Sequence, residues 1–447
     1  MSEKNDINDN RMETLTSLAK RRGFIYQGSE IYGGLAGTWD YGPLGVALKN
    51  NIKNLWWKMF VDSRTDMYGI DAAILMNPGV WKASGHVDTF TDPLVECTKC
   101  KRRFRADQLK EEGKCDECGG ATGTARQFNM MFQTQIGAVE DSSATVYLRP
   151  ETAQGMFVNF KNVIDSFHPK LPFGLAQIGK AFRNEITPRD FIFRVREFEQ
   201  MEIEFFLKPA DWEEYFEYFR KEMHRWMETI GINMQSVHEL EVATEDRAHY
   251  SSRTIDFEFD FPFGKKELYG LAYRTDFDLQ SHAKGSGQDL SYYDEETKER
   301  VTPHVIEPSF GLDRTVLALL TSAYKEDTST DEVRPYLAFK PAIAPVICAV
   351  SPLLKNKPEL REYAEGVYKI LKEEFGRVMW DDNGNIGKRY RRQDEIGTPW
   401  CIVIDFDTLG IEKPEQKDTV TIRDRDTGEQ QRIHKDELVS YIKERLN

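Results

Sequence analysis

Residues 175–207 place arginines, carboxylates and aromatic rings at spacings that could hold a charged, planar ligand. Apolar and charged residues alternate there in two runs joined by a loop, which predicts a long hairpin. The first run closes on Phe182-Arg183-Asn184-Glu185, and the second opens on Phe193-Arg194-Val195-Arg196-Glu197-Phe198. Arginine forks bind phosphates and an aromatic ring stacks on a heterocycle, so the pattern suits a nucleoside triphosphate. The commoner use of a charge-rich strand pair, a solvated edge, stays open from this stretch alone.

Residues 304–320 form a second stretch whose side chains could bind a ligand. A short strand carrying Glu307 is expected to break at Pro308 and to turn through Gly311 into a helix. Arg314 would then lie in the first helical turn, where the positive end of the helix dipole disfavours a cation. A bound triphosphate would reverse that penalty, so the stretch predicts a second contact to the same kind of ligand.

Four cysteines form two Cys-x2-Cys pairs, Cys97 with Cys100 and Cys115 with Cys118, separated by fourteen residues. Two such pairs are typical of a tetrahedral zinc ribbon in which each pair supplies one knuckle of thiolates. Four unrelated buried thiols are the alternative. Because no export signal precedes the cysteines, a reducing compartment and a metal site are favoured over disulfides.

Amphipathic helices and alternating strands must position these side chains. Residues 147–155 lead from an alternating stretch through Glu151, which could simply cap the helix that follows. A helix after Pro43 and another from Asp211 to Gly231 carry broad apolar faces, which usually pack in a core. Strands are expected at 255–263 and 267–276, and strand–helix alternation from about residue 340 onward implies a separate α/β domain.

Composition limits the possible functions of the chain. A length of 447 residues with 40% hydrophobic content predicts two or three domains with large cores. A net charge of −14 argues against indiscriminate binding to nucleic acid, although basic runs at 99–105 and 388–392 could touch RNA or could be solvated faces. The polar N-terminus is expected to be a frayed tail rather than a signal peptide. The longest apolar run, 342–350, is too short to span a bilayer.

Three stretches, in chain order, resemble the three signature motifs of class II aminoacyl-tRNA synthetases, specifically their dimeric, glycine-specific branch. YGPLGVALKNNI resembles motif 1, FRNE with RVREFEQMEIE resembles motif 2, GLDR resembles motif 3, and RPETAQG is similar to a further family segment. The resemblance implies an α+β fold, with an antiparallel sheet flanked by helices. It divides the chain into residues 1–96, the N-terminal part of the catalytic domain with motif 1; 97–125, a zinc-ribbon insertion; 126–338, the catalytic core with motifs 2 and 3; and 339–447, an α/β anticodon-binding domain.

The resemblance also implies an activity. ATP would activate glycine as glycyl-adenylate with release of pyrophosphate, and the 3′ end of tRNA(Gly) would then accept the glycyl group with release of AMP. Mg²⁺ would accompany ATP, with Glu267 and Glu307 as its expected ligands, and Zn²⁺ would occupy the ribbon. Motif 1 would build a homodimer, and the protein would be cytoplasmic, with neither a membrane nor DNA as partner.

Single residues receive roles from the same resemblance. Arg183 and Arg314 would be catalytic, Arg183 on the α-phosphate and Arg314 over the adenine, opposite Phe198. The residues expected to bind ATP are Arg183, Asn184, Glu185, Phe193, Arg194, Val195, Arg196, Glu197, Phe198, Glu267, Leu268, Gly311, Leu312, Asp313 and Arg314. Those expected around glycine are Arg105, Glu151, Phe198, Glu199, Gln200, Met201, Glu202, Glu307, Pro308, Ser309, Phe310 and Gly311.

Two other functions compete with this one. The first is a class II synthetase for another amino acid, against which the EPSFG run and three carboxylates beside so small a substrate argue. The second is a non-catalytic tRNA-binding relative, which the arginines retained in motifs 2 and 3 disfavour.

Overall fold

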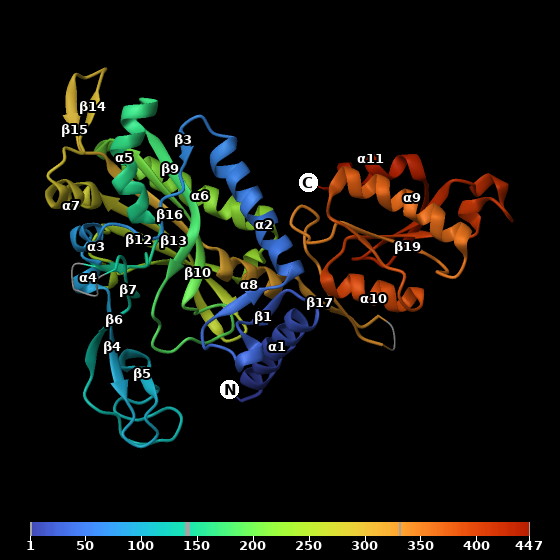
Figure 1. The fold of residues 1–447 in the computed structure, drawn as a ribbon, viewed down its shortest axis with the longest axis horizontal. Helices are drawn as coiled ribbons and strands as arrows, with labels where there is room; N and C mark the ends of the chain where they lie inside the picture. The colour runs from blue at the N-terminus through green and yellow to red at the C-terminus, as the bar shows by residue number, and fades with distance from the viewer. Residues whose placement is uncertain (1, 139–143, 330–331, 447) are drawn as a thin grey trace.

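A computed structural model describes residues 2–138, 144–329 and 332–446 of the protein. Its centre is a seven-stranded sheet with the order β11-β12-β13-β16-β10-β9-β3 (Figure 1). Neighbouring strands are antiparallel except for β3 and β9, which run parallel. The strands are β3 (Met67–Gly69), β9 (Phe173–Phe182), β10 (Glu197–Leu207), β11 (Val237–Glu241), β12 (Arg253–Phe261), β13 (Gly264–Thr275) and β16 (His304–Gly311).

Helices cover both faces of this sheet. Helices α2 (Pro43–Trp57), α6 (Trp212–Ile230) and α8 (Leu312–Ala323) pack on one face, and α5 (Ala153–Phe167) and α7 (Phe277–Ser286) pack on the other. Strand β10 serves both cores, because Phe205 packs with the first set and Phe206 with the second. The predicted helices after Pro43 and up to Gly231 are therefore confirmed, and their apolar faces are core faces.

The predicted long hairpin is confirmed as β9 and β10, joined by a loop at 183–196. The charged residues flanking the turn lie in this loop and not on paired strands, as the alternation had suggested. Backbone hydrogen bonds hold the loop. The Arg183 N–H donates to the Arg196 carbonyl at 2.9 Å, and the backbones of Arg189 and Arg194 form an isolated antiparallel β-bridge. The loop can therefore present several side chains to one cavity without the two-residue spacing of a strand.

The expected strand break at Pro308 is wrong. Strand β16 continues through Pro308 to Gly311 and pairs with β13 on one side and β10 on the other. Along β10 and β16, the pair Glu202↔Ser309 is followed by the pair Phe205↔Ile306, and Pro308 lies in the unpaired stretch between them. A proline, which has no N–H to donate, fits a central strand at such a gap in the ladder.

The cysteine-rich segment extends from the body of the protein, at the lower left of Figure 1. Its three-stranded antiparallel sheet has the order β5-β4-β6, with β4 (Thr91–Glu96), β5 (Arg103–Arg105) and β6 (Arg126–Asn129). The Met130 carbonyl, just beyond β6, accepts a hydrogen bond of 2.7 Å from the Asn184 N–H. Gln108 accepts another of 3.1 Å from Arg189, so the segment is attached to the 183–196 loop.

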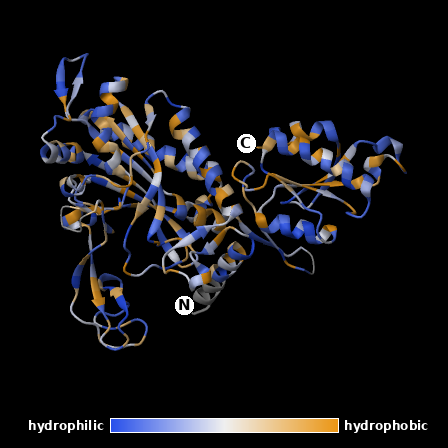
Figure 2. Cartoon of the chain, viewed as in Figure 1, coloured by the Kyte–Doolittle hydropathy of each residue, from blue (hydrophilic) through white to orange (hydrophobic). Residues whose placement is uncertain are grey.

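The C-terminal residues form a five-stranded mixed sheet with its own core, at the right of Figure 1. Its elements are β19 (Cys348–Pro352), α9 (Pro358–Phe375), β20 (Val378–Trp380), α10 (Ile386–Ile396), β21 (Trp400–Ile404), β22 (Thr419–Asp424), β23 (Gln430–His434) and α11 (Leu438–Glu444). Figure 2 shows hydrophobic residues along its strands and hydrophilic ones along α10. The predicted α/β alternation is confirmed.

Shorter elements surround these units, and the predicted frayed N-terminus is instead helix α1 (Ser2–Arg21). Burial of Leu15, Leu18 and Ala19 anchors its second half, and Arg21 and Arg22 form ion pairs of 3.1 and 2.5 Å with Glu395 of α10. The remaining elements are β1 (Ile25–Gln27), β2 (Trp39–Tyr41), α3 (Pro78–Ala83), α4 (His86–Thr89), β7 (Gln133–Gln135), β8 (Thr145–Tyr147), β14 (Tyr292–Asp294), β15 (Glu299–Val301), β17 (Tyr324–Asp327) and β18 (Arg334–Leu337).

A search of the helices in the described ranges finds none with the length and apolar character needed to cross a lipid bilayer.

Candidate active site

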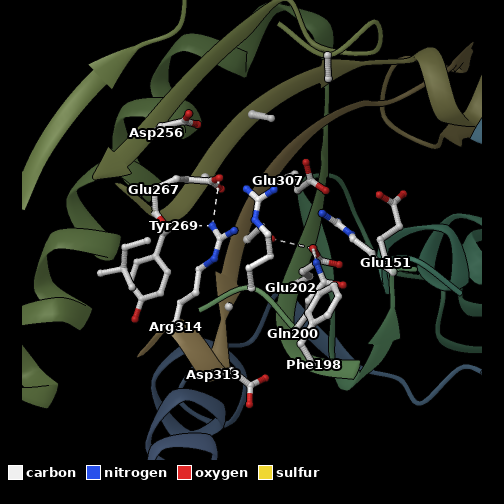
Figure 3. Close-up of a pocket in the computed structure, with 18 of the residues that line it drawn as sticks. Glu151, Phe198, Gln200, Glu202, Asp256, Glu267, Tyr269, Glu307, Asp313 and Arg314 are labelled. Carbon is white, nitrogen blue, oxygen red and sulfur yellow. Dashed lines mark hydrogen bonds and ion pairs between the residues drawn. The ribbon is translucent and has the colours of Figure 1, made fainter. Parts of the chain in front are cut away.

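A cavity of about 450 Å³ lies over the middle of the seven-stranded sheet. Strands β10, β13 and β16 form its floor, the 183–196 loop and the start of α8 contribute further walls, and the segments around Glu151 and Tyr250 complete it. Figure 3 shows Glu151, Glu202 and Glu307 toward one side of the cavity and Glu267 and Arg314 toward the other. The cavity therefore has an acidic end and an end that contains arginine.

Three carboxylates make the acidic end, and we call Glu151, Glu202 and Glu307 the carboxylate cluster. Glu202 is almost fully buried and accepts hydrogen bonds from Gln200 and Ser309, both at 2.7 Å. Its second oxygen accepts the backbone N–H of Thr152 at 3.2 Å and a hydrogen bond from the Thr152 hydroxyl. A carboxylate held by four donors has a fixed orientation, so Glu202 can present its charge to a ligand without rearrangement.

The strand register explains why two members of the cluster meet. Glu202 pairs with Ser309 across β10 and β16, and Glu307 is two residues from Ser309 on the same face of β16. Glu151 reaches the same place from the start of α5, where His86 lies 3.4 Å from it and Gln154 donates to it at 3.0 Å.

A buried arginine supports the cluster from below. Arg274 of β13 is fully buried, donates to Glu307 at 2.8 Å, and forms a two-pronged ion pair with Asp278 of α7 at 2.8 Å. Its guanidinium stacks 3.7 Å from the ring centroid of Tyr250. Gln154 joins this network, because its amide donates to Asp278 at 3.0 Å. One guanidinium thus neutralises part of the charge of several buried carboxyl groups.

The electrostatics of the cluster favour a cationic ligand. Burial raises the pKa of Glu307 and repulsion from Glu202 and Glu151 raises it further, whereas Arg274 offsets only part of this effect. Burial and the neighbouring Glu151 also raise the pKa of Glu202. Burial opposes the ionisation of Glu151, but His86 and Arg274 outweigh it and hold its pKa well below the usual range. An ammonium group entering among these carboxylates would relieve their mutual repulsion.

The opposite end of the cavity presents guanidinium groups and aromatic faces. Arg314, in the first turn of α8, forms a 3.1 Å ion pair with Glu267 of β13 and lies over the Phe193 ring at 4.5 Å. Arg183 lies over the Phe198 ring at 5.2 Å and donates to the Pro150 carbonyl at 3.1 Å. Arginines next to a helix N-terminus and beside aromatic faces are suited to phosphates and a planar base.

The predicted opposition of Phe198 and Arg314 differs from the contacts found. In this structure Arg183 lies over Phe198, and Arg314 lies over Phe193. A carboxyl group not foreseen from the sequence, Asp256 of β12, lines the same end, and burial together with Glu267 and Glu258 raises its pKa to about 7.

Most of the residues expected from the sequence line the cavity, and several do not. Those that line it are Arg105, Glu151, Arg183, Glu185, Phe193, Arg194, Val195, Phe198, Glu199, Gln200, Glu202, Glu267, Leu268, Glu307, Ser309, Gly311, Asp313 and Arg314. Within the described ranges, the lining lacks Asn184, Arg196, Glu197, Met201, Pro308, Phe310 and Leu312.

The physical reason for most of these differences is the alternation of strand faces. Met201 and Phe310 point to the opposite face of the sheet, where both are fully buried in the core with α2, α6 and α8. Arg196 instead donates to the Ala36 carbonyl at 2.6 Å. Glu199 lines the cavity and also forms ion pairs with Lys49 and Lys53 of α2 at 2.8 and 3.1 Å.

Sequence reasoning missed Arg274, His86 and Thr152. Arg274 lies in the strand expected at 267–276, where a charged residue within a strand is a signal that could have identified it. His86 precedes the cysteine-rich segment and reaches Glu151 only through the tertiary fold, and nothing in its local sequence marks it. Thr152 follows Glu151 directly, but a hydroxyl near a helix start usually serves as a cap.

The cysteine-rich segment brings the four expected thiols together. The sulfurs of Cys97, Cys100, Cys115 and Cys118 all lie within 4.8 Å of one another, and two of these residues are buried. The Cys100 N–H points toward the Cys97 sulfur at 3.4 Å, an arrangement that stabilises a thiolate ligand. The donor set fits a closed, four-coordinate metal site. Cys348 and Cys401 are buried in the C-terminal unit, apart from this cluster.

Comparison with known proteins agrees with the fold. Residues 132–323 match the description "tRNA synthetase class II core domain (G, H, P, S and T)", and residues 347–445 match "Anticodon binding domain". The antiparallel sheet, the arginine-lined cavity and the C-terminal unit together define a class II aminoacyl-tRNA synthetase.

Named relatives show which family within this class the chain belongs to. The chain is 50% identical to the glycine–tRNA ligase of Caldanaerobacter subterraneus subsp. tengcongensis, over 97% of this chain and 98% of the relative. It is 50% identical to that of Acetivibrio thermocellus, over 96% and 97%, and 49% identical to that of Bacillus anthracis, over 97% and 99%. The chain belongs to the glycine–tRNA ligase family.

Proposed function

We propose that the protein attaches glycine to the 3′ end of tRNA(Gly) through a glycyl-adenylate, consuming ATP and releasing pyrophosphate and AMP. The observation that carries the proposal is the pairing, in one cavity, of a buried carboxylate cluster with an arginine-lined end. The first suits the ammonium group of a small amino acid, and the second suits a nucleotide. Neither step needs a protein nucleophile, so positioning and charge stabilisation would carry the catalysis.

At the nucleotide end, Arg183 would hold the α-phosphate while negative charge develops there. Phe198 and Phe193 offer the two aromatic faces for the adenine, and Arg314 would lie against the base or the phosphates. Both guanidiniums now rest on those rings, so nucleotide binding would exchange these contacts for stacking on the base.

Mg²⁺ would accompany the triphosphate and neutralise its charge. Glu267 and Asp256 are the carboxylates at the nucleotide end, and Mg²⁺ in such sites takes one or two carboxylates plus phosphate oxygens. Glu307 is bonded to Arg274 at the other end of the cavity, so we assign it to the amino acid and not to the metal.

At the acidic end, the carboxylate cluster would receive the ammonium group of glycine. Ser309 donates to Glu202 at 2.7 Å and would lie beside the α-carbon. Attraction alone gives a pocket only about 1 to 3 kcal/mol of discrimination per methylene group, so larger amino acids would be refused mainly by clash with this rigid wall.

The proposal divides the chain as the sequence suggested: residues 1–96 and 126–338 for catalysis, 97–125 for the metal ribbon, and 339–447 for reading the anticodon. The basic run on α10 contributes less than expected to an RNA surface. Arg389 is buried and donates to the Pro352 carbonyl at 2.5 Å, and Arg392 is paired with Asp381 at 2.6 Å. Lys388 is left exposed.

Zn²⁺ is the metal that best suits the four thiolates, since a closed tetrahedron of four cysteine sulfurs is a structural zinc site. The metal would hold the two knuckles of the ribbon in register. No step of the reaction requires it, because the sulfurs belong to the projecting segment and do not line the cavity.

A homodimer would account for exposed apolar side chains near motif 1. Ile31 and Tyr32 are 90% and 86% exposed in a short 3-10 helix before β2, and Leu35 before β2 and Val46 in α2 are also exposed. An apolar patch of this kind usually marks a contact with another protein. Sedimentation of the wild type against Ile31→Asp tests this: the variant should shift toward the monomer.

ATP–pyrophosphate exchange measured with each of the twenty amino acids tests the proposal as a whole. We expect exchange with glycine and strongly reduced exchange with alanine and serine. Exchange dependent on a different amino acid would overturn the assignment to glycine, and tRNA binding without any exchange would support a non-catalytic role.

A further inference from the structure

A carboxyl group with no hydrogen-bond partner lies beneath the carboxylate cluster. Glu204 of β10 has 0% of its surface exposed, and among the described residues neither of its carboxyl oxygens has a partner. Leaving a buried polar group unpaired is costly, and each such group in a folded protein calls for an explanation. Glu204 does not line the cavity, and nothing described above gives it a role.

The strand register places Glu204 against the cluster. The pairs Glu202↔Ser309 and Phe205↔Ile306 on β10 and β16 set Glu204 directly opposite Glu307, on the sheet face that carries Glu202. On its other side along the strand lies Phe206, within the aromatic core of α5. Glu204 is therefore enclosed between the cluster and an apolar wall.

The distribution of donors decides which carboxyl group carries a proton. Glu202 accepts four hydrogen bonds, and Glu307 accepts the guanidinium of Arg274, whereas Glu204 accepts none. The charged groups acting on Glu204 are Glu202 on its own strand, Glu307 on β16, Arg274 on β13 and Asp278 on α7. Arg274 is the one cation of these four, and it is already shared between Asp278 and Glu307.

Two carboxyl groups that face each other in a buried site do not both ionise, and the one without donors keeps the proton. We propose that Glu204 is a positioning residue that remains a neutral carboxylic acid at neutral pH and donates its proton toward Glu307. Glu307 can then stay ionised beside Glu202 for the ammonium group of glycine. Burial, together with Glu307, raises the pKa of Glu204 well above its usual range, in agreement with the geometry. The inference rests on the proposed activation of glycine.

Two substitutions separate this role from simple space filling. Glu204→Gln keeps the shape and an uncharged donor, so the glycine KM in pyrophosphate exchange should stay within about twofold of wild type. Glu204→Leu keeps the approximate volume but removes the donor, so the glycine KM should rise about tenfold while the ATP KM holds. A tenfold rise in Glu204→Gln would overturn the proposal, and so would a wild-type glycine KM in Glu204→Leu.

Infrared difference spectroscopy reads the proton directly. At neutral pH the wild type minus Glu204→Gln spectrum should contain the carbonyl band of a protonated carboxylic acid, shifted by deuteration. A spectrum without that band would show that Glu204 is ionised and would overturn the proposal even if Glu204→Leu failed to fold. This measurement needs no substrate, so its result does not depend on the proposed function. The proposed function is refuted separately, if wild-type exchange does not depend on glycine.

Discussion

Replacing Glu202 with glutamine tests how glycine is held. The substitution keeps the size of a nearly fully buried side chain and removes the charge nearest to Ser309. In either orientation the new amide N–H₂ would face hydrogen-bond donors, because Gln200 and Ser309 donate to one Glu202 oxygen and Thr152 donates to the other. Loss of one partner of a buried charged pair costs about 2 to 5 kcal/mol.

The lower part of that range applies, because two members of the carboxylate cluster remain. A loss of about 2 to 3 kcal/mol corresponds to a rise in glycine KM of roughly 30- to 160-fold. ATP–pyrophosphate exchange at saturating ATP and varied glycine measures this rise. The ATP KM should change by less than about threefold, since the arginines of the nucleotide end are untouched.

Glu239→Gln is a matched control. It also removes one carboxylate charge, but from an ion pair with Arg220 at the sheet edge, away from the cavity. If Glu202→Gln left the glycine KM unchanged and weakened ATP instead, Glu202 would belong to the nucleotide half of the site and the division of the cavity drawn above would be wrong.

Four further outcomes follow from the structure. Arg183→Ala should lower the rate of pyrophosphate exchange by about 10²- to 10³-fold with little change in melting temperature, and wild-type exchange would refute its role at the phosphate. Elemental analysis should find one zinc per chain, lost in Cys100→Ser and retained in Cys348→Ser; protein purified without chelator yet free of zinc would contradict this. Truncation after Val346, which keeps every buried residue of the central core except Ile396, should spare glycine activation and weaken tRNA charging; equal loss of both in a folded truncation would make the C-terminal unit structural. Because folding raises the pKa of Glu204 well above its ordinary value of 4.5, the native state binds more protons than the unfolded state once the pH exceeds that value, so the unliganded protein should lose stability as pH rises from there toward neutrality. Thermal melting of Glu204→Gln should show a shallower loss over the same pH range, and an unchanged slope would refute the assignment of the proton to Glu204.

Local sequence patterns predicted the helices and the main hairpin because each has a strong period of its own. The apolar stripe after Pro43 and the run that ends at Gly231 became α2 and α6, and both pack their stripes in the central core. Helix α1 was not predicted, because its first half is polar and its support comes from the tertiary burial of Leu15 and Leu18.

Site residues that lie within a short sequence motif could be predicted, whereas residues that the tertiary fold brings to the site could not. Glu151, Glu202 and Glu307 were named from short runs of sequence. Arg274 was not, because its role depends on Asp278 four residues on and on Glu307 across the sheet. The basic run on α10 was misleading for a similar reason, since Arg389 binds backbone carbonyls inside its own unit, and the sequence cannot distinguish that use from an RNA contact.

The contact between α1 and α10 bears on the order in which the chain can fold during synthesis. Arg21 and Arg22 meet Glu395 across more than 370 residues of sequence, and Phe24 packs with its ring 6.3 Å from that of Phe339. At about 5–20 residues per second, the N-terminal segment waits roughly 20 to 75 seconds for Glu395 to be synthesised. During that interval both arginines lack the carboxylate that they pair with in the folded protein. Some of the first residues to leave the ribosome are thus among the last to reach their final contacts, and a ribosome stalled before Glu395 would hold a catalytic body whose N-terminal helix lacks these two ion pairs.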